Sequence, residues 1–108
     1  MKKTMIAATF VLASFSASAS TFCDLVETQA KLAMTLRQYG KPLSEALREV
    51  KFEGVYKDIY DLLVMEAYGL PAFHTESFQE NAITEFTSKH LLFCLQHEKR
   101  NKSKQKSL

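Results

Sequence analysis

Apolar residues recur every three or four positions along most of the chain beyond residue 20, and no useful stretch alternates as a β-strand would. This spacing predicts four helices, over about 22–39, from Ser44 to near 51–53, over about 54–68 and over about 78–98. Gly-x-Pro runs at 40–42 and 69–71 are expected to end the first and third helices. The expected fold class is therefore all-α, a small bundle of four helices, one of them short.

The two later helices differ in their apolar pattern. The third is apolar round most of its circumference, which is typical of a central core helix. The fourth is expected to begin with a capping box formed by Ser77 and Glu80. Its expected core face carries Ala82, Ile83, Phe86, His90, Phe93, Cys94 and His97.

The first 19 residues have the features of a signal peptide. Lys2 and Lys3 precede an apolar run over 5–15 that is too short to span a bilayer as a helix. The sequence Ala-Ser-Ala at 17–19 is a cleavage signal, so the mature chain is expected to begin at Ser20. These features predict a soluble protein exported to a bacterial periplasm. Phe22 is too large for the residue before a lipidated cysteine, which argues against lipidation of the next residue.

Two cysteines remain in the mature chain, Cys23 and Cys94. In an oxidising compartment such a pair predicts a disulfide, which here would tie the start of the first helix to the later turns of the fourth. A reactive thiol is the alternative, but neither cysteine belongs to a Cys-x-x-Cys motif.

Charge divides the mature chain into two parts. The net charge of +2 over 108 residues excludes a strongly basic nucleic-acid binder, and the length suits one domain. Residues 20–98, the expected helical domain, hold twelve acidic and seven basic residues. Residues 99–108 hold five basic residues, no acidic one and no apolar residue before Leu108, which predicts a disordered basic tail. This tail either keeps the protein in solution or contacts anionic lipid.

Glu66 is the one carboxylate that falls inside an apolar helix face. A buried carboxylate needs a partner, and Arg37 and His90 are the nearest candidates by face; alternatively its side chain reaches water from the last turn. His90 and His97 are interpreted as partly buried or helix-end histidines, with pH sensing as an alternative. The sequence has no nucleophile elbow or Gly-rich phosphate loop, so no enzyme activity, cofactor or metal is expected.

Two groups of apolar residues are not required by the helical core stripes. Leu91, Leu92 and Leu95 point away from the expected core face, and Leu70 and Phe73 lie in the loop after the third helix. Either other elements cover these side chains, or they are anchors for a partner protein.

Several short motifs resemble a group of short exported proteins encoded largely in phages, prophages and gamma-proteobacteria. The motifs are Cys23-x13-Arg37-Gln38-x-Gly40, Ala67-Tyr68-x-x-Pro71, Thr75-Glu76, Ile83-x-x-Phe86 and the late Cys94. The resemblance implies export, helicity and a disulfide. Weaker similarities are to phage spackle-type superinfection-exclusion proteins and to HdeA-type periplasmic chaperones. The expected function is a non-catalytic protein that binds and blocks another protein, with an acid-stress chaperone as the alternative.

Overall fold

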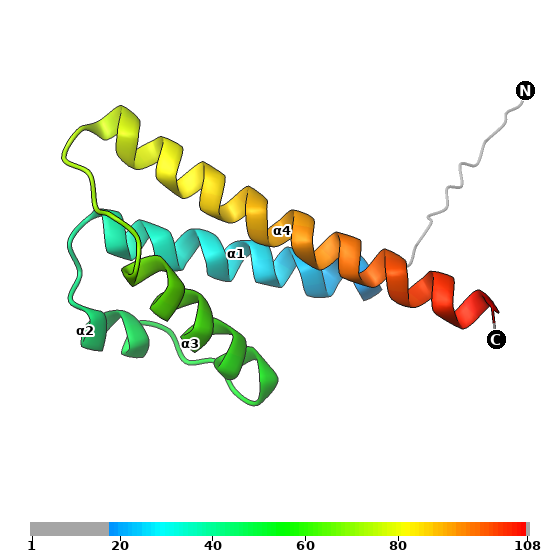
Figure 1. The fold of residues 1–108 in the computed structure, drawn as a ribbon. Helices are drawn as coiled ribbons and strands as arrows, with labels where there is room; N and C mark the ends of the chain where they lie inside the picture. The colour runs from blue at the N-terminus through cyan, green and yellow to red at the C-terminus, as the bar shows by residue number, and fades with distance from the viewer. Residues whose placement is uncertain (1–17, 108) are drawn as a thin grey trace, which may run out of the picture.

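The structure, a computed structural model, describes residues 18–107 and the side chains of residues 21–104. It contains α1 (Ser18–Gln38), α2 (Leu43–Arg48), α3 (Val55–Tyr68) and α4 (Glu76–Ser107), and no strand occurs in this part of the chain (Figure 1). The predicted all-α fold with four helices, one of them short, is confirmed. Most of the predicted signal peptide lies outside the described residues.

The C-terminal end of α1 is fixed by a glycine in the left-handed region. Gly40 has φ 85°, which an L-amino acid with a side chain rarely adopts. Its N–H donates to the carbonyl of Arg37, and the N–H of Lys41 donates to that of Leu36. This pair of bonds is a Schellman motif, and Pro42 follows it directly. The predicted end of the first helix is therefore correct.

The predicted starts of two other helices were wrong. Helix α2 begins at Leu43, so Ser44 lies within it, and the amide of Ala46 bonds to the carbonyl of Pro42 at 2.9 Å. Helix α4 begins one residue before Ser77, which excludes that serine as its cap. The first helical bonds run from Ala46 to the carbonyl of Pro42 and from Gln79 to that of Thr75, so in both helices the cap position lies two residues before the serine.

Helix α1 is the central element of the fold. It packs against α4, which runs antiparallel to it, and against α3 on another side, whereas α3 and α4 do not pack closely on each other (Figure 1). Small residues on α1 allow this double contact, since Ala30 and Ala33 are fully buried. The core comprises Ala30, Ala33, Met34, Ala46, Tyr60, Leu63, Val64, Ala67 and Phe86.

Helix α3 is not the central core helix that its composition predicted. Its inner face, which includes Leu63 and Val64, is buried against α1, but Leu62 is 64% exposed and Met65 is 53% exposed. Phe93 of α4, expected on the core face, is also 64% exposed. The reason is geometric: α3 packs on α1 and on the short α2, and α4 packs on α1, but α3 and α4 do not pack closely on each other, so the sides that they turn toward one another stay open.

The disulfide between Cys23 and Cys94 closes the contact between α1 and α4. The two Cα atoms lie 5.7 Å apart, and the link spans 71 residues of sequence. It joins the early turns of α1 to α4, as the sequence predicted. The two helices therefore cannot separate at this end without breaking a covalent bond.

Buried polar side chains attach α3 to α1 and α2 to α3. Gln29 of α1 donates from Nε2 to the carbonyl of Tyr56 at 3.0 Å, which holds the start of α3. The hydroxyl of Tyr60 donates to the carbonyl of Ala46 at 2.7 Å, which holds α2. Burial, with a smaller contribution from the Glu49 carboxylate, raises the pKa of Tyr60 to about 12, so this hydroxyl stays a donor.

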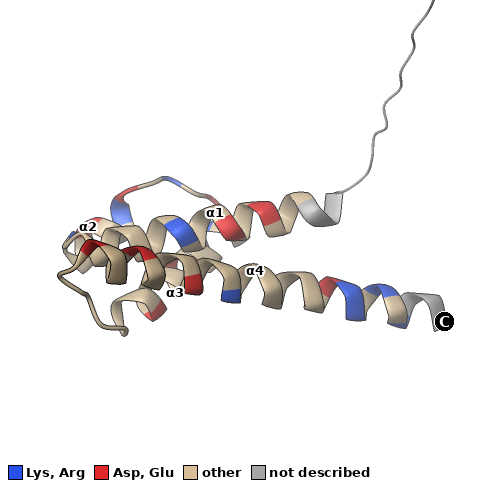
Figure 2. Ribbon diagram, turned by 90° about the horizontal axis from the view of Figure 1, so that it is seen from above, with Lys and Arg blue, Asp and Glu red and all other residues tan. Residues whose placement is uncertain are grey.

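The basic C-terminal segment is helical as far as Ser107, where a disordered tail was expected. Lys99, Arg100, Lys102 and Lys104 are exposed, so the extension does not contribute to the core. The segment has no Gly or Pro, and Lys, Arg and Gln favour helix, which explains why α4 continues without a breaker. Figure 2 shows these cations on the end of α4 that projects beyond the start of α1. None of the described helices has the length and apolar character needed to cross a bilayer.

Removal of the disulfide in Cys23→Ala/Cys94→Ala is expected to lower the free energy of unfolding by about 4 kcal/mol, because a 71-residue loop is then free in the unfolded chain. Urea unfolding followed by far-UV circular dichroism measures the difference. The wild-type protein in excess reductant is the control and should match the variant. A difference below about 1 kcal/mol would contradict the structural role of the bond.

Truncation after Glu98 is expected to leave the melting temperature of the body within about 2 °C, because surface changes away from the core are nearly neutral. The helical signal per molecule at 222 nm should fall by the contribution of residues 99–107. Circular dichroism of both proteins at equal molar concentration gives both values. An unchanged molar signal would show that the extension is not helical in solution.

Candidate functional site

An apolar groove lies where α3 and α4 diverge, and we call it the α3–α4 groove. Phe22 and Val26 of α1 form its floor, and Ile59, Leu62 and Leu63 of α3 form one wall. Its volume is about 430 Å³. The groove exists because both walls pack on α1 and not on each other, so apolar side chains that face it remain in contact with water.

The second wall belongs to α4, where residues with helical spacing line the groove. They are His90, Phe93, Cys94 and His97. His90 is largely buried, with its ring 4.6 Å from that of Phe86 in an edge-on arrangement, whereas Phe93 and His97 are exposed. The covalent link at Cys94 holds this wall at a set distance from the floor. The apolar lining is therefore supported by a rigid pair of helices.

Glu66 bridges the two walls at the end of the groove opposite the disulfide. Its Oε2 accepts a hydrogen bond from Lys89 Nζ at 2.7 Å, and its Oε1 lies 3.1 Å from His90 Nε2. The Glu66 side chain is 38% exposed and that of His90 is 16% exposed. The two expectations for this residue are therefore both met in part, since it has a partner and also reaches water.

Opposing effects set the pKa of Glu66. Burial, the largest effect, raises it, while the hydrogen bond from Lys89 and the positive charges of His90 and Lys89 lower it. The lowering effects together are larger, so the pKa lies below its usual value of 4.5. The carboxylate is thus ionised at neutral pH and can hold α3 to α4.

Arg37, the other expected partner of Glu66, has a different role. Its Nε donates to the carbonyl of Leu70 at 2.9 Å, and its guanidinium lies over the ring of Tyr68, 5.4 Å from the centroid. Lys89 takes the place that the sequence analysis considered for Arg37. The only sequence feature that connects Lys89 with Glu66 is its position directly before His90. Sequence position alone does not predict the direction of a lysine side chain.

A second hollow, the loop hollow, contains two of the predicted anchor residues. Leu70 and Phe73 line it together with Phe78, whose ring centroid is 5.9 Å from that of Phe73. Its volume is about 490 Å³. Both predicted anchors are partly exposed, so the loop covers the end of the bundle only in part.

The loop that carries these anchors is held by amide side chains. Buried Gln38 donates to the carbonyl of Pro71 at 2.8 Å and accepts from the amide of Phe73 at 2.9 Å. Gln79 donates to the carbonyls of both Gln38 and Phe73. The loop is therefore fixed against the end of α1, a role that sequence reasoning missed.

The outer leucines of α4 lie outside both hollows. Leu92 is 56% exposed, Leu95 is exposed and Leu91 is half-buried. Among the described residues, no other element covers Leu92, although Leu91 is partly covered. The structure thus separates the five predicted anchors into a loop pair, Leu70 and Phe73, and an outer helix group.

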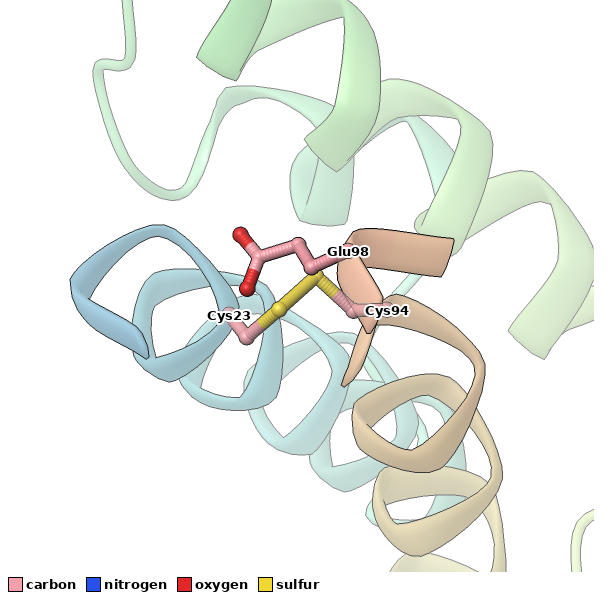
Figure 3. A group of neighbouring side chains, drawn as sticks. All are labelled: Cys23, Cys94 and Glu98. Atoms are coloured by element: carbon pink, nitrogen blue, oxygen red, sulfur yellow. A yellow bond between two sulfur atoms is a disulfide. The ribbon is translucent and has the colours of Figure 1, made fainter. Parts of the chain in front are cut away.

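Three residues of metal-binding types meet at the disulfide. The two sulfur atoms and a carboxylate oxygen of Glu98 lie within 4.8 Å of one another, and Figure 3 shows Glu98 folded back toward the bond. Because each sulfur is bonded to the other, neither is a thiolate that could bind a metal ion. The group is therefore a structural link beside a carboxylate.

Comparisons with protein-family models, curated proteins and solved structures found no match for this chain. Function is therefore inferred from the geometry of the two hollows and from the charges that surround them.

Glu66→Gln is expected to lower the free energy of unfolding by less than about 1 kcal/mol at pH 7, because the pair is partly exposed and screened. Since the folded pKa is lowered, this contribution is fully present above about pH 4.5 and is lost as the pH falls through the lowered pKa. Urea unfolding of both proteins from pH 7 to pH 2 measures it. The control is Glu80→Gln, which removes an exposed carboxylate of α4. A wild-type advantage that grows toward low pH would contradict this account.

Proposed function

We propose that this chain is an exported, non-catalytic protein that binds a segment of another protein in the α3–α4 groove and thereby blocks that protein. The observation that carries the proposal is the exposure of Leu62 and Phe93 on opposite walls of one apolar groove. Large apolar side chains that face each other across a solvent-filled groove are typical of helix-in-groove recognition.

The groove is well suited to tight binding because its walls need little ordering. The disulfide and the core contacts of α1 hold the floor and the α4 wall, and Glu66 links the walls at one end. A preformed site loses less conformational entropy on binding than a flexible one. The apolar residues supply the free energy, and the charged end supplies orientation.

The concrete form of the proposal follows the resemblance of the sequence motifs. In a periplasm, a small disulfide-linked helical protein of this kind would bind a phage lysozyme or a tail component and exclude a second phage. Blocking of this type needs no chemistry from the binder, only occupation of a surface that the target requires. The loop hollow, with Leu70 and Phe73, is the second contact area in this proposal.

An acid-stress chaperone is the second candidate, and one observation favours it. The bridge between α3 and α4 depends on an ionised Glu66, so protonation in strong acid would remove it and loosen α3. Such a chaperone would bind many clients at about pH 2–3 and few at neutral pH. A blocking protein would bind one partner at neutral pH with its fold intact.

We expect Leu62→Asp and Phe93→Asp each to abolish partner binding while the melting temperature changes by no more than a few degrees, because both side chains are exposed. The test introduces a photo-crosslinking residue at position 62 or 93 of the exported protein and analyses crosslinked products at neutral pH by mass spectrometry. One defined product from both positions is expected.

Position 92 is the matched control for position 93, because Leu92 lies beside Phe93 in sequence but on the outer side of α4. A crosslink from position 92 but not from 62 or 93 would place the binding surface on the outer leucines of α4. Crosslinks to many proteins, and only in acid, would favour the chaperone. Absence of any product at all three positions, in cells that show phage exclusion, would contradict binding through the α3–α4 groove and through the outer side of α4.

A further inference from the structure

Two sulfur atoms and a carboxylate converge where the early turns of α1 meet α4. The sulfurs of Cys23 and Cys94 and an oxygen of Glu98 all lie within 4.8 Å of one another (Figure 3). Glu98 follows Cys94 by four residues, so one face of α4 carries both side chains. Two helices therefore place three donor atoms of metal-binding types together.

The position of Glu98 is not explained by the oxidised chain. Its side chain is half-buried, whereas residues 95–97, 99 and 100 are exposed. Among the described side chains Glu98 takes part in no ion pair, although Lys102 lies one turn further along α4. A disulfide has no proton to donate to a carboxylate. The carboxylate thus faces two sulfurs that, while they are bonded to each other, do not balance its charge.

The same positions suit a tetrahedral zinc ion once the two sulfurs are thiolates. Zn²⁺ binds thiolate sulfur at about 2.3 Å and carboxylate oxygen at about 2.0–2.2 Å, so its sulfur ligands lie about 3.8 Å apart and a sulfur and an oxygen about 3.6 Å apart. Donor atoms within 4.8 Å of one another reach these separations by small side-chain rotations. The cysteine Cα atoms, 5.7 Å apart, are close enough for both sulfurs to reach one ion.

We propose that the dithiol form of this chain binds one zinc ion through Cys23, Cys94 and Glu98, with water in the fourth position. Reduction of the disulfide consumes one dithiol reductant, which becomes a disulfide while the two cysteines become thiols. Zn²⁺ then displaces the two thiol protons and binds both thiolates. Thiolate ligands favour zinc over the hard cations calcium and magnesium. The ion takes the place of the disulfide as the link between α1 and α4.

Such a site gives the chain a second way to hold its two longest helices together. The chain is synthesised with thiols, and disulfides form only in an oxidising compartment. Without either link, noncovalent contacts alone hold α4 to α1. With the ion bound, the α4 wall of the α3–α4 groove, which includes Cys94, stays beside its floor. The inference does not depend on the proposed function, because it concerns the link between the helices.

The test uses the mature chain reduced with a phosphine, which supplies no competing thiolate, with Co²⁺ and then Zn²⁺ as the probes. Thiolate-to-cobalt charge-transfer absorption reports sulfur ligands, and displacement of cobalt by zinc gives the Kd for zinc. We expect one ion per chain, a monomer by light scattering and a higher melting temperature than that of the reduced chain without metal. The oxidised chain is the control and should show no thiolate absorption.

Two carboxylate variants form a matched pair. Glu98→Gln should raise the Kd for zinc at least about tenfold, because loss of even an outer partner of a metal ligand costs about 10- to 100-fold. Asp24→Asn removes an exposed carboxylate directly beside Cys23 and should change the Kd by less than about threefold. In the oxidised form both variants should melt as the wild type does. Equal effects of the two substitutions on the Kd, or an unchanged Kd in Glu98→Gln, would overturn the inference.

Other modes of metal binding give distinct results. One ion per two chains, with a dimer by light scattering, would overturn the inference because the metal then bridges separate molecules. A weaker Kd in His97→Ala but not in Glu98→Gln would give the third ligand to the histidine and overturn the role of Glu98. If the reduced chain loses its helical signal without metal, zinc should restore that signal, and a failure to restore it would also overturn the inference.

Discussion

The packing of α1 against both α3 and α4 is the constraint on which the rest of the structure depends. Ala30 and Ala33 leave room for two helices to approach the same stretch of α1. The disulfide then prevents α4 from moving away from α1 at its C-terminal half. With one helix as the common support, a bundle of this size has too few elements to cover the outer faces of α3 and α4.

The α3–α4 groove is the direct consequence of that arrangement. A fourth long helix would bury Leu62, Met65 and Phe93, but the short α2 packs on α3 elsewhere, through Ala46 and Tyr60. Exposed apolar area on this scale carries a cost in solubility unless a partner covers it. The same geometry places a charged bridge, Glu66 with Lys89, at one end of the groove and the disulfide near the other.

Helical periodicity and the cysteine pair were sufficient to predict the fold class and the covalent link, because both depend on local spacing and on compartment. The same features could not show that part of the apolar surface of α3 faces an open groove. An apolar stripe in the sequence does not reveal whether another element packs on it. Phe93 was assigned to the core for the same reason.

The buried amides Gln29 and Gln38 were missed because their partners are backbone groups 27 to 35 residues away. The serine caps were misplaced because each of the two helices begins one residue before its serine. The basic segment was judged by its lack of apolar residues, although its helix needs none.

The central claim is that Leu62 and Phe93 face water across an open groove, whereas Leu63 and Val64 of the same α3 helix as Leu62 are buried in the core. Paramagnetic relaxation of side-chain signals by a soluble gadolinium chelate tests it in solution. The account predicts strong broadening at Leu62, Met65 and Phe93 and protection at Leu63 and Val64, unchanged on dilution. Protection of Leu62 and Phe93 equal to that of Leu63, at every concentration, would mean that α3 and α4 close on each other and that the groove does not exist.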